Sequence, residues 1–182
     1  MSVTKPTEPE GERDLGPEAD PESVARKILL DQLTGRARTR SELAEKLRKR
    51  NVPDDIATRL LDRFEEVGLI NDAAFAQDWI AQRQMPRGLA KRALAQELKR
   101  KGLDDDVAQA ALGEIDGDAE ISAAREQVRR KLRSMSGLDP ERATRRLVGM
   151  LARKGHSAGM AYRIVREELE AAGLEAAEAS LD

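Results

Sequence analysis

One ten-residue pattern occurs three times along the chain, and this repetition constrains the fold more than any other feature. It reads LAEKLRKRNV at 43–52, LAQELKRKGL at 94–103 and LVGMLARKGH at 147–156. Its first residue is Leu43, Leu94 and Leu147 in turn, at offsets of 51 and 53 residues. A repeat of about 50 residues predicts tandem structural units that pack on their neighbours.

The composition favours helices in every unit. The 182 residues include 27 Ala and 21 Leu, whereas Val and Ile together number 15. Ala and Leu are strong helix formers, and a sheet would need more β-branched residues. We therefore predict an all-α chain of three tandem three-helix units, each resembling a helix-turn-helix, at 23–70, 71–116 and 117–172. Because each unit has a small core, the units are expected to share interfaces in an elongated, curved array.

Local signals mark the helices inside each unit. Thr39, with Glu42 three residues later, forms the pattern of an N-terminal capping box, and Asn51 tolerates the left-handed conformation that ends a helix. Pro53 suits the first position of the next helix. The stretch 86–88, Pro-Arg-Gly, is expected to be a loop. Helices are expected near 22–33, 39–50, 53–67, 72–85, 89–101, 104–115, 118–135, 139–154 and 157–172.

The two ends of the chain differ in charge from its middle. Residues 1–22 carry four prolines and a net charge of −5, so this segment is expected to be a disordered acidic tail. Residues 173–182 carry a net charge of −3 and are expected to form a frayed acidic C-terminus. The body, 23–172, carries a net charge of +6, which the total of −2 conceals. A basic body between acidic tails predicts an anionic partner.

The chain lacks most of the residues on which enzymes and metal sites depend. It has no cysteine and one histidine, His156, which excludes disulfides, thiolate chemistry and histidine-rich metal sites. The sequence contains no phosphate-binding loop or dinucleotide-binding motif. No apolar run reaches the length of a transmembrane helix, and the polar N-terminus lacks a secretory signal. We expect a cytoplasmic, non-enzymatic protein with no cofactor and no membrane partner.

Basic residues cluster at the end of each repeated segment and in two further places. A cation near a helix C-terminus is favourable by about 0.3–1 kcal/mol through the helix dipole, which is a structural explanation. The recurrence also predicts a basic stripe that binds phosphates or an acidic protein surface. Arg125, Arg129 and Arg133 place like charges four residues apart, which is locally unfavourable and suggests an anionic partner. The candidate binding residues are Arg36, Arg38, Arg40, Lys46, Arg48, Lys49, Arg50, Lys99, Arg100, Lys101, Arg125, Arg129, Arg133, Arg153 and Lys154.

The few aromatic residues and the single histidine are interpreted as structural. Phe75 and Trp79 take the positions that Val24 and Ile28 hold in the first unit, so core packing is favoured over base stacking. His156 stands where the other two units have apolar residues. It is therefore expected to be half-buried between helices.

Three stretches in order, SELAEKLRKRNV, GLINDAAFAQDWIAQRQ and GLAKRALAQELKRKGL, resemble the RecX family. GLINDAAF at 68–75 is the most distinctive part, and the resemblance extends over about residues 23–172. It implies a cytoplasmic bacterial regulator of the RecA recombinase, with a role in DNA repair and the SOS response. It also implies an elongated array of three-helix modules in the groove of the RecA–DNA filament that inhibits strand exchange, coprotease activity and ATP hydrolysis. The family has no catalytic motif, so the basic stripe is assigned from charge alone.

The sequence alone leaves functions of several classes open. A monomeric modulator of the RecA filament would bind RecA on single-stranded DNA tightly and bare DNA weakly, with strong salt dependence. An array of helix-turn-helix units would bind duplex DNA without RecA. A protein-only adaptor would keep its partner after neutralisation of Lys49, Arg50, Arg100 and Lys101. An enzyme is the least favoured class, because the usual pairs of catalytic nucleophile and base are lacking.

Overall fold

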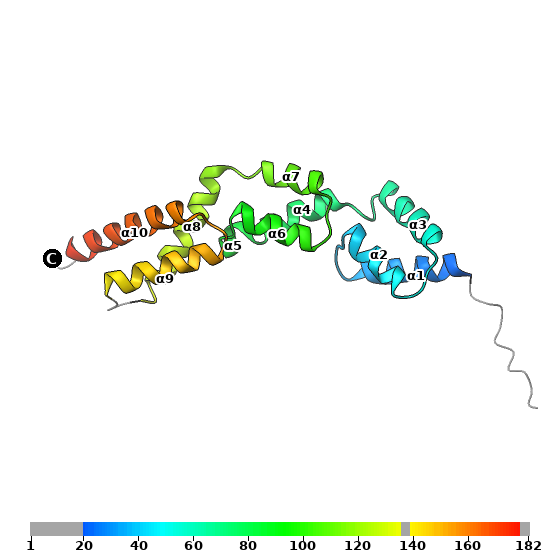
Figure 1. Ribbon diagram of the computed structural model, residues 1–182, viewed down its shortest axis with the longest axis horizontal. Coiled ribbons are helices and arrows are strands. Elements are labelled where there is room, and N and C mark those ends of the chain that lie inside the picture. The colour runs from blue at the N-terminus through cyan, green and yellow to red at the C-terminus, as the bar shows by residue number, and fades with distance from the viewer. Residues whose placement is uncertain (1–19, 136–138, 179–182) are drawn as a thin grey trace, which may run out of the picture.

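The computed structural model describes residues 20–135 and 139–178, and every regular element in these residues is a helix. The helices form an elongated array that the chain follows from one end to the other (Figure 1). They are α1 (Pro21–Thr34), α2 (Arg40–Arg48), α3 (Asp54–Glu66), α4 (Asp72–Ala81), α5 (Gln84–Arg87), α6 (Lys91–Arg100), α7 (Asp105–Gly113), α8 (Gly117–Leu132), α9 (Pro140–Arg153) and α10 (Ala158–Glu178). The prediction of an all-α array of three-helix units is confirmed.

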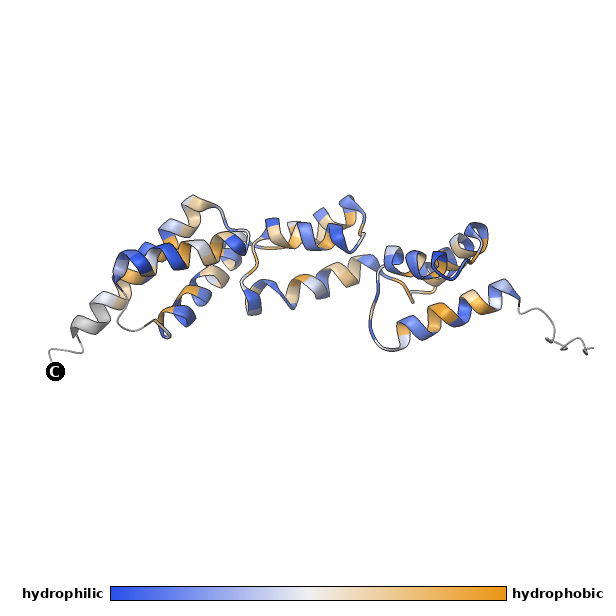
Figure 2. Ribbon diagram, turned by 60° about the horizontal axis from the view of Figure 1, so that its bottom comes forward, coloured by the Kyte–Doolittle hydropathy of each residue, from blue (hydrophilic) through white to orange (hydrophobic). Residues whose placement is uncertain are grey.

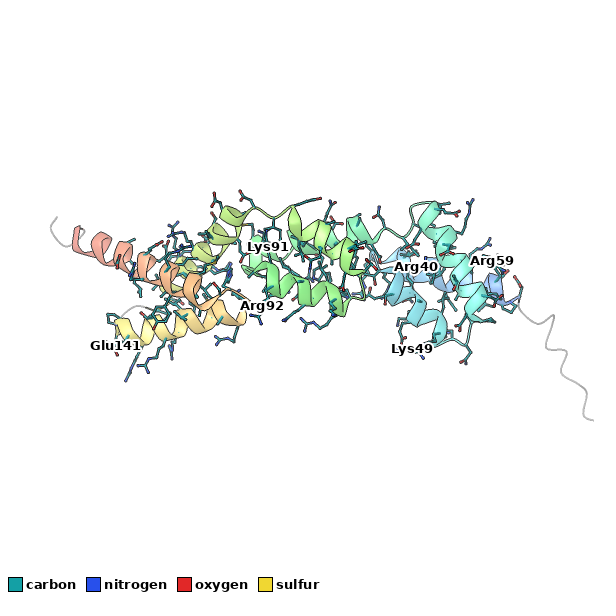
Figure 3. All side chains as sticks on the ribbon, turned by 45° about the horizontal axis from the view of Figure 1, so that its top comes forward. Arg40, Lys49, Arg59, Lys91, Arg92 and Glu141 are labelled. Atoms are coloured by element: carbon teal, nitrogen blue, oxygen red, sulfur yellow. The ribbon has the colours of Figure 1, made fainter. Side chains whose placement is uncertain are left out.

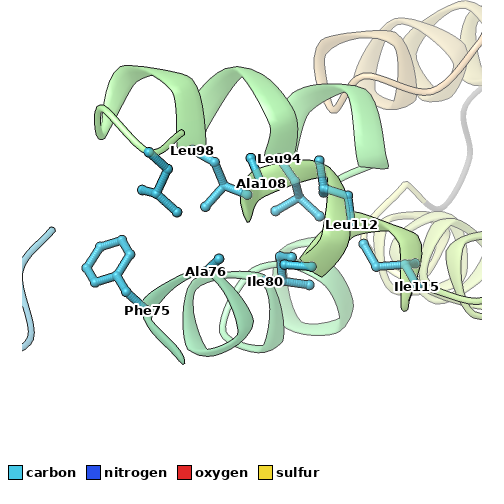
Figure 4. Packing of buried hydrophobic residues seen from close by; sticks show 10 residues of the cluster. Phe75, Ala76, Ile80, Leu94, Leu98, Ala108, Leu112 and Ile115 are labelled. Atoms are coloured by element: carbon cyan, nitrogen blue, oxygen red, sulfur yellow. The ribbon is translucent and has the colours of Figure 1, made fainter. Parts of the chain in front are cut away.

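Each unit has a hydrophobic core of its own. The repeated leucines Leu43, Leu94 and Leu147 are fully buried, one in each core. In the second unit, Leu94 and Leu98 of α6 pack with residues of α4 and α7 (Figure 4). Apolar and polar residues alternate along each helix at helical spacing, as expected for helices with one buried face (Figure 2). The periodicity of the sequence therefore places the cores correctly.

Successive units are joined end to end through their middle helices, α2, α6 and α9. The hydroxyl of Thr39 donates to the carbonyl of Lys101 at 2.8 Å, so the start of α2 meets the end of α6. The backbone N–H of Ala90 donates to the carbonyl of Lys154 at 2.9 Å, so the start of α6 meets the end of α9. Each joint places the negative end of one helix dipole beside the positive end of the next, which is favourable.

A residue two or three positions after the end of each middle helix has a left-handed backbone conformation. Asn51, Gly102 and Gly155 hold matching positions, with φ of 54°, 73° and 93°. A Cβ atom on Gly102 would lie 2.2 Å from the hydroxyl oxygen of Ser41, and one on Gly155 would lie 2.8 Å from the Cβ of Ala93. The two joints therefore require glycine. Asn51 follows α2, whose end meets no other unit, so it is exposed and a side chain is tolerated there.

Four expected ranges differ from the structure. The helix predicted at 72–85 ends at Ala81, and α5 follows it. Pro86 lies in α5 and not in a loop; it is accommodated there because the first N–H groups of a helix have no helical partner. Helix α10 continues to Glu178, beyond the predicted end near 172, and 179–182 lie outside the described residues. Of the acidic tail predicted at 1–22, residues 1–19 also lie outside them, and α1 begins at Pro21.

Candidate functional site

Lys101, one of the predicted binding residues, lies inside the joint between the first and second units. Its ammonium group donates to the carboxylate of Glu42 at 2.6 Å and lies 4.7 Å from the centre of the Trp79 ring. Burial would raise the pKa of Glu42, but the hydrogen bond and charge of Lys101 hold this pKa below its ordinary value. Glu42 also completes the predicted capping box with Thr39. Lys101 therefore has a structural role in this joint.

Lys154 and His156 occupy the joint between the second and third units. The ammonium group of Lys154 donates to the backbone carbonyl of Arg87, and burial with nearby arginines lowers the pKa of Lys154. The Nε2 atom of His156 lies 2.9 Å from the carbonyl oxygen of Gly88. His156 is only 5% exposed, so the prediction of a half-buried histidine is wrong in degree. The packing of one unit on another removes it from solvent.

Trp79 is packed by neighbours from its own unit. Its ring stacks on Phe75 with centroids 5.5 Å apart, and the guanidinium of Arg83 lies 3.2 Å from the ring centre. The indole N–H donates to the carboxylate of Glu97 at 2.8 Å. These contacts support the interpretation of Trp79 as a packing residue and not as a base-stacking platform.

The predicted binding residues Arg36, Arg38 and Arg40 lie between α1 and the first residue of α2, which is Arg40 itself, and they have different roles. The guanidinium of Arg40 donates to Asp62 and Glu65 of α3, at 2.6 Å each. Arg38 donates to the backbone carbonyl of Gln32 at 3.0 Å. Arg36 is exposed and has no ion pair within residues 20–135 and 139–178. Of this cluster, Arg36 has the most accessible charge.

The arginine row on α8 faces acidic residues of α10. Arg125 donates to Glu167 and, at 3.0 Å, to Glu168, while Arg129 donates to Glu168 at 2.7 Å. Glu168 is 5% exposed; burial would raise its pKa, but the hydrogen bonds of Arg129 and Arg125 hold it below the ordinary value. Arg133 lies 3.9 Å from Glu126. Two of the three arginines in this row are therefore paired by a helix that is distant in the sequence.

The other predicted stripe residues lie on the surface along the middle helices. Arg48 and Lys49 share the carboxylate of Glu45, at 2.7 and 3.2 Å. The remaining five are exposed, and no ion pair joins them to another residue in the described part of the chain. They are Lys46, Arg50, Lys99, Arg100 and Arg153.

Sequence reasoning missed four exposed arginines on the same helices. Arg92 lies on α6 near its joint with α9, and it is labelled in Figure 3. Arg142, Arg145 and Arg146 are exposed on α9. Their spacing of three and four residues, continued to Arg153, is a helical signal that could have found them. All four lie just before the repeated ten-residue segment of their unit, so the repeat does not mark them.

Within the described residues, no helix is long and apolar enough to cross a membrane, and no group of three or more side chains could hold a metal ion.

Family models match three successive segments of the chain. The description "RecX, first three-helix domain" matches residues 25–64, "RecX, second three-helix domain" matches 71–112, and "RecX, third three-helix domain" matches 118–165. The chain belongs to the RecX family. The matched segments correspond to α1–α3, α4–α7 and α8–α10, so the RecX domains coincide with the three separate cores.

RecX relatives cover most of the chain. Regulatory protein RecX of Streptomyces coelicolor is 54% identical over 157 residues, which are 86% of this chain and 84% of that protein. Regulatory protein RecX of Thermobifida fusca is 49% identical over 163 residues, 88% of each chain. The crystal structure of RecX from Lactobacillus salivarius has a TM-score of 0.72 and 22% identity, and covers 83% of this chain and 98% of that one. The Streptomyces and Thermobifida relatives are named as regulatory proteins and not as enzymes.

Proposed function

We propose that this RecX-family chain is a monomeric, cytoplasmic regulator that binds the RecA–DNA filament. Binding inhibits the recombinase, ATPase and coprotease activities of RecA in DNA repair and the SOS response. The partners are RecA and the single-stranded DNA inside its filament, and bare DNA binds weakly. Membership of the RecX family, together with an end-to-end line of cationic middle helices, is the observation that carries this proposal.

The shape of the molecule supports a filament as the partner. Three separate cores are linked by hydrogen bonds at the ends of α2, α6 and α9, so each unit contacts only its neighbours. An array of this kind presents a long surface in place of one deep pocket. A long surface matches a groove built from many repeated subunits, because several subunits are contacted at once.

The charges that carry this function are the exposed ones along the middle helices. Arg50 of the first unit and Lys99 and Arg100 of the second are exposed, and the part of the chain that the structure describes offers them no ion pair. The guanidinium of Arg100 donates to the backbone carbonyl of Gln96 at 3.3 Å. A phosphate or acidic side chain can therefore approach these three residues without breaking an internal ion pair. Lys101, by contrast, already holds a joint, so its replacement would test stability as well as binding.

The test is ATP hydrolysis by the cognate RecA on single-stranded DNA while the protein is titrated in. We expect dose-dependent inhibition by the wild type. The triple variant Arg50→Gln, Lys99→Gln, Arg100→Gln should need about tenfold more protein for half inhibition, which corresponds to about 1.4 kcal/mol of binding free energy.

The matched control is the triple variant Arg26→Gln, Arg59→Gln, Arg63→Gln. These arginines are also exposed, but each is engaged with Glu22 or Glu66, and the loss of charge is the same. Its inhibition curve should overlay that of the wild type. Absence of inhibition by the wild type, with tight binding to bare duplex DNA, would support a RecA-independent DNA-binding array. Inhibition that the basic triple leaves unchanged would support contacts to protein alone.

A further inference from the structure

We propose that the outer face of α9 binds the phosphate backbone of DNA directly, without RecA and without sequence preference. This face, the α9 ridge, consists of Arg142, Arg145, Arg146, Gly149 and Arg153. The inference deepens the proposed function by assigning the DNA contact mainly to the third unit, although binding to bare DNA does not itself depend on RecA.

The α9 ridge lies on the side of the helix opposite the core. Ala143, Leu147 and Leu151 are buried in the third core, and they are offset from the ridge by about half a turn. The four ridge arginines are exposed, and none forms an ion pair with any residue that the structure describes. Arg142 and Arg146 are four residues apart, so their like charges repel each other in the free protein.

Gly149 brings a further positive charge to this face. A Cβ atom at Gly149 would lie 3.4 Å from a terminal nitrogen of Arg153, so the guanidinium of Arg153 lies back over this glycine. The matching positions in the other units are Glu45, which pairs with Arg48 and Lys49, and Gln96. The third unit has neither an acid nor a bulky side chain there. The ridge therefore concentrates positive charge that no acid pairs with in the described part of the chain, which favours an external anion as its ligand.

The line of charge continues onto the second unit. The end of α9 meets the start of α6 through the hydrogen bond from Ala90 to Lys154. Arg92 lies just beyond this joint, on the same long edge of the array as Glu141 at the far end of α9 (Figure 3). Lys99 and Arg100 follow on α6, also exposed. One anionic polymer could contact both helices.

The chemistry of the ridge favours nucleic acid over protein. Protein interfaces depend on buried apolar anchors, but none of the large exposed apolar residues lies on α9 or α6. Those residues are Val24, Leu30, Val67, Leu69, Met85 and Tyr162. Guanidinium groups match phosphate oxygens with paired hydrogen bonds. From Arg142 to Arg153 the helix rises about 16 Å, enough to span several phosphates of one strand, which follow at about 3.4 Å along duplex DNA.

The test is fluorescence anisotropy of the full chain with a labelled 30-nucleotide single strand and a 30-base-pair duplex, between 50 and 200 mM salt. The ridge variant is Arg142→Gln, Arg145→Gln, Arg146→Gln. For three lost contacts to a single strand, the slope of log K against log salt should fall by about 2. Affinity at 100 mM salt should fall at least about tenfold. The control variant Arg26→Gln, Arg59→Gln, Arg63→Gln should keep the wild-type slope.

The outcomes separate this inference from the proposed function. Equal losses of DNA affinity in the two triple variants would show an effect of net charge alone and would overturn the proposal that the α9 ridge binds DNA. If the ridge variant binds DNA as the wild type does but no longer inhibits RecA, the ridge contacts protein and the proposal is also overturned. Loss of DNA binding in the ridge variant, with no inhibition of RecA by the wild type, would sustain the ridge and reject the filament proposal. If the triple Gln variant unfolds, the single variants Arg142→Gln, Arg145→Gln and Arg146→Gln decide, because each should lower the salt slope by about 0.7 and an unchanged slope in all three would overturn the proposal.

Discussion

Gly155 offers the sharpest test of how the units are joined. It follows α9 with φ of 93°, and a Cβ atom there would lie 2.8 Å from the Cβ and 3.0 Å from the backbone nitrogen of Ala93. Neither atom can move without shifting α6. We therefore expect Gly155→Ala to force the second and third units apart.

The magnitude follows from two contributions to the free energy of unfolding. A residue with a Cβ atom in the left-handed conformation costs about 1–2 kcal/mol. Crowding against a backbone that cannot yield adds about 1–3 kcal/mol. Gly68 isolates the first contribution, because its φ is 75° and no atom lies within 4 Å of its added Cβ. Gly68→Ala should cost about 1–2 kcal/mol and Gly155→Ala about 2–5 kcal/mol.

The assay is urea denaturation followed by two signals. Far-ultraviolet circular dichroism reports the helices of all three units, whereas fluorescence of Trp79, the only tryptophan, reports the second unit. The two transitions should coincide in the wild type and in Gly68→Ala. In Gly155→Ala the loss of helix should precede the change in fluorescence, because the third unit loses its neighbour. Coincident transitions and equal costs for the two alanines would refute the packing argument.

Three further predictions follow from single contacts. Glu168→Gln should cost about 1–3 kcal/mol, because it removes charged hydrogen bonds to Arg125 and Arg129. Since these bonds outweigh burial and hold the pKa of Glu168 below its ordinary value, the stabilisation is present above the unfolded-state pKa and is lost as the pH falls through the folded-state pKa. Thermal unfolding from pH 7 to 3 should therefore show a weaker acid dependence in the variant, and an unchanged dependence would contradict the pairing. The hydroxyl of Thr39 accepts from the backbone N–H of Glu42 and donates to the carbonyl of Lys101. Thr39→Val should therefore lower the free energy of unfolding by about 1–3 kcal/mol in urea denaturation, while Thr39→Ser should stay near the wild type. Gly149→Ala should stabilise the protein by about 0.5–1 kcal/mol in the same assay, because its Cβ would meet one flexible side chain at 3.4 Å; a loss of stability would show that the contact is tighter.

The periodicity of the chain allowed the core to be predicted well. The matching leucines Leu43, Leu94 and Leu147 lie on the apolar face of an amphipathic helix. They are buried because the helix removes this face from water by packing it against the core. The capping box at Thr39 was also predicted, since it depends on residues three apart in the sequence. Such local rules act within a few residues, so sequence alone is sufficient for them.

The roles of individual cations could not be predicted in the same way. Lys101 and Lys154 end two matching helices, as Arg50 does, yet each lies in a joint while Arg50 is exposed beyond the last one. The row on α8 looked unpaired because its acids come from α10, about 40 residues away. Whether a charge is available to a partner depends on what the other units place beside it.

The sequence by itself determined the number of units, their helical class and the residues of each core, because backbone propensity and apolar periodicity are local properties. Only the tertiary structure decided which positive charges remain open to solvent. End-to-end stacking engages the cations at two of the three matching helix ends in hydrogen bonds across the joints. Among the residues that the structure describes, the arginines on the outer face of α9 have no acid in an ion pair. Which charges are paired and which are exposed depends on contacts between residues far apart in the chain. No single segment of the sequence predicts such contacts.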